Sequence, residues 1–166
     1  SDSMSSIKNT REEIQNLIRQ NRIEEALQSL HHSGNDSLWY QNARAVCLMR
    51  SGEPKKAAEI LSGYVYKKNT VVFNANIPLV IKINCVTAML LEGNVAGALN
   101  ILNNIEGNHA LIQKVRDAVR NWRRREPLWR RISMRLGMFP FERPVRLDFT
   151  PGEIDLDGND SETPTR

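Results

Sequence analysis

Three segments of this chain share a pattern that determines how it folds: LIRQNRIEEALQSL (residues 17–30), LMRSGEPKKAAEIL (residues 48–61) and MLLEGNVAGALNIL (residues 89–102). Each contains a turn residue, an alanine five positions later and a leucine four positions after that: Asn21, Ala26 and Leu30; Gly52, Ala57 and Leu61; Gly93, Ala98 and Leu102. Glycine and asparagine tolerate the left-handed backbone of a tight turn between helices. The alanine lets two helices approach closely, and the leucine falls on the same helix face and fills the core.

This pattern resembles the tetratricopeptide repeat (TPR), a helix–turn–helix unit of about 34 residues. The resemblance covers residues 7–106 and implies an all-α fold, a right-handed α-α superhelix of antiparallel helix hairpins (a TPR-like solenoid). Seven positions before the turn the family prefers a small residue; Ala45 fits, whereas Ile14 and Val86 depart from the preference. The turns are 31 and then 41 residues apart. The additional length falls in residues 62–77, which predicts a longer second helix or a wider loop there.

Hydrophobic spacing places six repeat helices at residues 7–20, 23–33, 37–51, 54–67, 77–92 and 95–106. A seventh helix is expected at residues 108–125, where Leu111, Val115, Ala118, Val119 and Trp122 recur at helical spacing. A solenoid needs a terminal element that covers its last open face, so we expect this helix to be a cap.

The chain divides into four regions of different character. Residues 1–6 are expected to be a flexible N-terminus or a cloning remnant, residues 7–125 the repeat domain with its cap, residues 126–141 a short basic helix, and residues 142–166 an extended acidic tail. Residues 113–146 carry eleven Arg or Lys and three acids, hence +8, whereas residues 147–166 carry six acids and one Arg, hence −5. In the tail, Val145, Leu147 and Phe149 alternate with charged residues, as in a strand with one apolar side. This predicts that the tail packs on a helical surface, with its acids near Arg side chains of the basic segment or of the groove, in the same chain or a neighbouring one. The alternative is a solvated tail.

Catalytic and metal-binding patterns are missing from the sequence. His31 and His32 are adjacent and point in different directions on a helix, and His109 stands alone. Cys47 and Cys85 fall in apolar helical pattern and are expected to be core residues. We therefore expect no enzyme, no cofactor and no metal site. With neither a signal peptide nor a membrane-spanning stretch in the sequence, a cytoplasmic location is expected.

The resemblance implies a binding groove lined by the first helix of each unit. Its inward positions, transferred one at a time, are Arg11, Gln15 and Arg19 in the first unit, Trp39, Asn42, Val46 and Arg50 in the second, and Val80, Ile83, Asn84 and Thr87 in the third. Arg19 and Arg50 occupy the same position of successive units. The alternative for these residues is an ordinary solvated surface that binds nothing.

A second candidate surface is rich in Arg and Trp. It comprises Arg120, Arg123, Arg124, Arg125, Trp129, Arg130, Arg131 and Arg135. Arg with interleaved Trp suits phosphate contacts and stacking, and residues 128–139 also have the pattern of a basic amphipathic helix at a membrane surface. One alternative is a capping element whose arginines are solvated and whose tryptophans pack in the core. Another is contact with an acidic protein or with the chain itself.

These features predict a non-catalytic protein–protein interaction scaffold that binds an extended or helical partner segment in its groove. The expected partner is a protein or peptide of acidic character, with self-association through the C-terminal tail as a further expectation. The alternative function is peripheral binding of anionic lipid or nucleic acid through residues 120–135.

Overall fold

The computed structural model describes residues 2–138 and 143–156, with side chains from residue 10 onward, and it is all-α. Its helices are α1 (Asp2–Arg19), α2 (Ile23–Ser33), α3 (Leu38–Arg50), α4 (Pro54–Val65), α5 (Leu79–Glu92), α6 (Val95–Asn103), α7 (Ala110–Arg125) and α8 (Leu128–Arg135). The predicted helices are confirmed to within a few residues at most ends. The largest difference is at the N-terminus, where α1 begins at Asp2 instead of residue 7.

The three turns adopt the backbone that the repeated pattern predicts. Asn21, Gly52 and Gly93 have φ of 57°, 86° and 93°. The alanine five positions after each turn has no exposed surface, and the three leucines that follow are buried as well. Each turn therefore joins two helices that pack closely through the alanine: α1 with α2, α3 with α4, and α5 with α6.

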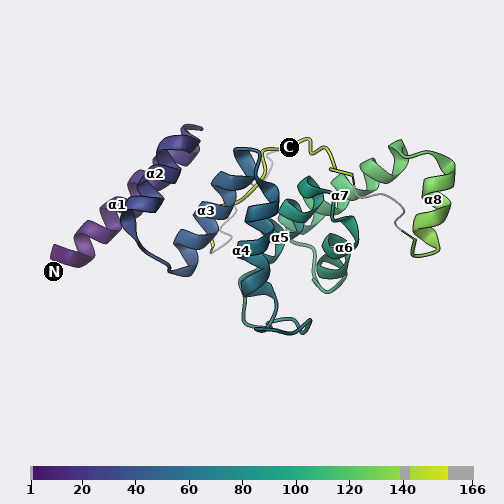
Figure 1. The fold of residues 1–166 in the computed structure, drawn as a ribbon, viewed down its shortest axis with the longest axis horizontal. Coiled ribbons are helices and arrows are strands. Elements are labelled where there is room, and N and C mark those ends of the chain that lie inside the picture. Colours follow the sequence, from purple (N-terminus) through teal and green to yellow (C-terminus); the bar gives the residue numbers. More distant parts are fainter. Residues whose placement is uncertain (1, 139–142, 157–166) are drawn as a thin grey trace.

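The helix pairs are stacked in chain order (Figure 1). α2 packs on α3, α4 on α5, and α3 also reaches α5. The positions expected to hold small residues, Ile14, Ala45 and Val86, are all fully buried.

The additional residues of the second unit form a loop and not a longer helix. α4 ends at Val65, and the chain turns back through an isolated antiparallel bridge between Tyr66 and Phe73. The rings of these two residues lie 5.1 Å apart between centroids. At the tip, Val71 and Val72 are exposed.

α7 packs against α5, as expected of a capping helix. Its buried residues are Ile112, Val115, Ala118 and Val119. Trp122, which was expected on the buried side of this helix, packs against the core but is only partly buried, and Arg123, Arg124 and Arg125 are exposed.

Residues 143–156 contain no helix and run back along the array from α7 toward α3 (Figure 1). Val145 is buried and Leu147 and Phe149 are partly buried, while Arg146 and Asp148 between them are exposed. The predicted alternation is therefore confirmed. Asp157, Asp160 and Glu162 of the predicted acidic tail lie outside the described residues.

Candidate functional site

The C-terminal segment (residues 143–156) enters the array at the end of α5. The Val145 N–H donates at 2.8 Å to the Leu90 carbonyl at the end of α5, which also accepts from the Gly93 N–H at 3.2 Å. At Gly93 the backbone of Arg143 is so close that an added Cβ would lie 2.8 Å from its carbonyl carbon. The same glycine thus makes the turn between α5 and α6 and leaves room for the segment.

Arg50, at the end of α3, holds the next part of the segment by its main chain. Its Nε donates to the Pro151 carbonyl at 2.8 Å and its Nη2 donates to the Gly152 carbonyl at 2.9 Å. Partial burial lowers the pKa of Arg50, while the nearby Cys47 and Glu153 act in the opposite direction. The guanidinium stays protonated near neutral pH because its ordinary pKa is so high.

Asn42 of α3 and Asn84 of α5 together bind both main-chain groups of Glu153. The Asn84 Oδ1 accepts from the Glu153 N–H at 2.9 Å, and the carbonyl of Glu153 accepts from the Asn84 Nδ2 at 2.7 Å and the Asn42 Nδ2 at 2.9 Å. The second Nδ2 proton of Asn84 is donated to the Asn42 Oδ1 at 2.7 Å. Both amides are buried. The pair therefore recognises an extended backbone without reading a side chain.

Gly152 is required for this close approach. A Cβ on it would lie 2.9 Å from both methyl carbons of Val46, and its φ of 91° is itself unfavourable for other residues. Two positions later, Ile154 is buried with 6% of its surface exposed. An occupant of this site thus needs a residue without a side chain opposite Val46 and gains from an apolar side chain two residues further on.

The structure brings only part of the predicted groove together on the segment: Asn42, Val46, Arg50 and Asn84. Ile83 and Thr87 are buried in α5, where the Thr87 hydroxyl donates to the Ile83 carbonyl, and Val80 is buried too. In α1, Gln15 is partly buried and Arg19 is exposed.

Trp39 and Arg11 form a separate contact beyond the Asn pair. The Arg11 guanidinium lies 4.7 Å from the centroid of the Trp39 ring, and Trp39 is almost fully buried. Its indole N–H has no acceptor among the described residues. A cation of α1 therefore lies on an aromatic ring of α3.

The prediction that the tail packs on a helical surface is confirmed, and the segment contacts α3, α5 and α7. Phe149 of the segment lies under the ammonium group of Lys114 of α7, 4.7 Å from its ring centroid. A cavity of about 460 Å³ remains between Met49, Arg50 and residues 147–151. The alternation of apolar residues indicated that the tail packs on helices, but no sequence signal indicated which helices.

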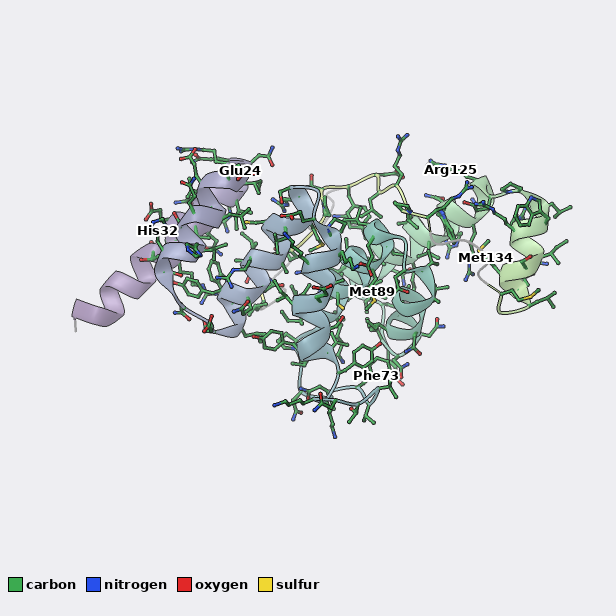
Figure 2. The ribbon with its side chains drawn as sticks, viewed as in Figure 1. Glu24, His32, Phe73, Met89, Arg125 and Met134 are labelled. Atoms are coloured by element: carbon green, nitrogen blue, oxygen red, sulfur yellow. The ribbon has the colours of Figure 1, made fainter. Side chains whose placement is uncertain are left out.

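The predicted basic surface lies at the far end of the array from α1 (Figure 2). Five arginines and one methionine line a cavity of about 220 Å³ between α7 and α8: Arg120, Arg123, Arg124, Arg131, Arg135 and Met134. Arg120 pairs with Asp117, and Arg130 with Glu126. The Arg130 guanidinium also lies 5.2 Å from the centroid of the Trp129 ring. Trp129 is exposed, so the alternative in which both tryptophans of this region are core residues is wrong for Trp129.

The cysteines are ordinary core residues. Both are buried, and burial raises the pKa of Cys47 to about 12 and that of Cys85 to about 11. In the part of the chain that the structure describes, no three His, Cys, Asp or Glu side chains are grouped so that they could hold a metal ion. None of its helices is long and apolar enough to cross a membrane.

Comparison with known proteins gives no further guide to the site. No family model, no curated protein and no solved structure matches this chain.

Proposed function

We propose that this chain is a non-catalytic scaffold of the tetratricopeptide-like class, its helix hairpins forming a right-handed superhelix, and that it binds an extended segment of a partner protein. The observation that carries the proposal is the grip of Asn42, Asn84 and Arg50 on the main chain of residues 151–153. Buried amides that satisfy both main-chain groups of one residue fit any extended chain with suitable neighbours.

In this proposal residues 143–156 occupy the groove until a partner displaces them. A competing segment would place glycine opposite Val46, an acidic residue near Arg50 and an apolar residue at the position of Ile154. The acidic preference follows from the positive charge of the Arg50 guanidinium, which lies near Glu153. The groove is therefore expected to bind a protein that carries an extended, acidic and glycine-containing stretch.

A labelled peptide with the sequence of residues 143–156 tests this proposal by fluorescence polarisation. The full chain should bind it weakly because its own segment competes. Gly152→Leu should dislodge that segment, since the strained backbone and the clash with Val46 together cost about 1–3 kcal/mol. The Gly152→Leu chain should consequently bind the peptide about tenfold more tightly, or better.

Gly107→Leu is the matched control. Gly107 has a similar φ of 104° but no neighbouring atom within 4 Å of an added Cβ, so this variant should bind the peptide like the parent chain. Adding Asn84→Leu to Gly152→Leu should abolish binding. Equal binding by the parent chain, Gly152→Leu and the double variant would refute a main-chain grip by the groove.

A further inference from the structure

α8 turns its apolar side to the solvent. Leu128, Ile132 and Leu136 are 69%, 49% and 69% exposed, and at 3.6 residues per turn they fall on one side of the helix. Met134, from another side of α8, instead lines the cavity shared with α7 and points toward that helix in Figure 2. A helix that belonged to the core would bury its apolar side and expose its charged side.

Cations border this apolar side. Around the helix axis, Arg131 and Arg135 lie beside the side formed by Leu128 and Ile132. Across the cavity, these two arginines face Arg123 and Arg124 of α7. Within residues 10–138 and 143–156, no carboxylate forms an ion pair with any of these four arginines. The surface therefore combines solvent-exposed aliphatic side chains with a cluster of positive charge.

We propose that α8 and the end of α7 dock on an anionic phospholipid bilayer. Leu128, Ile132 and Leu136 enter the boundary between head groups and acyl chains, and the arginine cluster contacts lipid phosphates. Trp129, 53% exposed next to this side, lies at head-group depth, where its amphipathic ring is favoured.

The apolar side distinguishes a bilayer from a nucleic acid as the partner. Phosphate contacts and base stacking would use the arginines and Trp129. They would leave three aliphatic side chains in water, whereas insertion into a bilayer buries them. Electrostatic attraction and apolar insertion each give weak attachment alone, and stable peripheral binding requires both.

Docking through α8 leaves the groove accessible. α8 lies at the end of the array (Figure 2). In the C-terminal segment, Glu153 contacts α3 and α5, and Phe149 contacts α7. The proposal is thus independent of peptide binding and can hold or fail separately from it.

Vesicle co-sedimentation of the full chain provides the test. The chain should bind phosphatidylcholine vesicles that contain phosphatidylserine, bind pure phosphatidylcholine vesicles far less, and lose binding in high salt. Leu128→Ser, Ile132→Ser and Leu136→Ser should each reduce partitioning by about tenfold. Arg124→Ser, Arg131→Ser and Arg135→Ser should each reduce it by about fivefold. Circular dichroism should show unchanged helix content, because all six side chains are exposed.

A matched control lies in the loop between α4 and α5. Lys67, Lys68, Val71 and Val72 are exposed cations and aliphatic residues, and the variant with serine at all four positions should bind vesicles like the parent chain. Trp129 fluorescence should shift to shorter wavelength on anionic vesicles, and Trp129→Phe should remove that shift.

Three results would overturn the proposal. One is a loss of vesicle binding in the loop variant that equals the loss in the α7 and α8 variants. Another is vesicle binding that the three Leu or Ile variants leave unchanged. The third is tighter binding to duplex DNA or to single-stranded RNA than to anionic vesicles, with the arginines but not the aliphatic residues contributing.

Discussion

At the scale of single residues, close packing at the alanine positions carries the fold. Ala26, Ala57 and Ala98 have no exposed surface, and each lies on the second helix of a pair that packs against the first. Their identical offset from a left-handed turn residue was visible in the sequence. A close helix contact requires a small side chain, and a left-handed turn requires a residue such as glycine or asparagine, so both positions are restricted to few residue types.

Replacement of Ala57 by leucine should overpack the crossing of α3 and α4. We expect the free energy of unfolding to fall by about 1–3 kcal/mol, as measured by urea denaturation. Ala96→Leu is the control, because Ala96 is exposed on α6 and its replacement should change stability by less than about 0.5 kcal/mol. Equal effects of the two substitutions would contradict the close approach at Ala57.

Cys47 should make the protein less stable at high pH. Burial raises its pKa from 9.0 to about 12. The unfolded thiol therefore loses its proton first, so the stability that the group contributes is complete below pH 9 and is lost as pH rises toward 12. The loss is about 1.4 kcal/mol per pH unit over that window. Cys47→Ala should show a correspondingly smaller decrease in the free energy of unfolding from pH 9 to 10.5, and parallel pH profiles would contradict the burial effect.

At the scale of elements, the helices were more predictable than their contacts with the tail. Periodicity and turn residues placed the helices, and alternation in residues 145–149 predicted a tail with one apolar side. The sequence could not show that Asn42 and Asn84 bind Glu153, since contacts to main-chain atoms impose no pattern on the residue that is bound. It also favoured acid–arginine contacts, whereas Arg50 donates to the carbonyls of residues 151 and 152.

Asn84→Ala should loosen the C-terminal segment while the helices stay folded. Without that amide, the Glu153 N–H and the Asn42 Oδ1 lose a partner, at a cost of about 1–3 kcal/mol for each group that water cannot reach. Hydrogen exchange followed by mass spectrometry should then show faster exchange in peptides covering residues 143–156, with α3 and α5 protected as before. Asn104→Ala, at an exposed asparagine after α6, should leave exchange in the segment unchanged. Unaltered exchange in Asn84→Ala would contradict the role of the amide pair.

At the scale of the whole molecule, the chain is a stack of helices that its own end partly covers. The basic α7–α8 end and the groove lie on different parts of the array, and the segment that fills the groove carries acids that offset part of the basic charge. Removing residues 143–166 eliminates three arginines and six acids and raises the net charge from +4 to +7. Residues 143–156 therefore cover part of α3 and α5, and residues 143–166 together lower the net charge of the molecule.

A chain that ends at residue 142 should remain helical but melt at a lower temperature. Burial of Val145 and Ile154 stabilises the folded chain by about 1.5–3 kcal/mol for each side chain, and the shortened chain loses these contacts. A net change of a few kcal/mol corresponds to about 2–4 °C in Tm per kcal/mol for a chain of this size.

The peptide of residues 143–156, added in trans, should raise that Tm again, by an amount that grows with the logarithm of its concentration. At one hundred times the Kd the gain is about 2.7 kcal/mol. A scrambled peptide should have no effect, because it does not place glycine opposite Val46 or an apolar residue at the position of Ile154. The shortened chain could instead melt at the same temperature as the parent chain and show no response to the peptide. That result would contradict both the stabilisation by the segment and its competition for the groove.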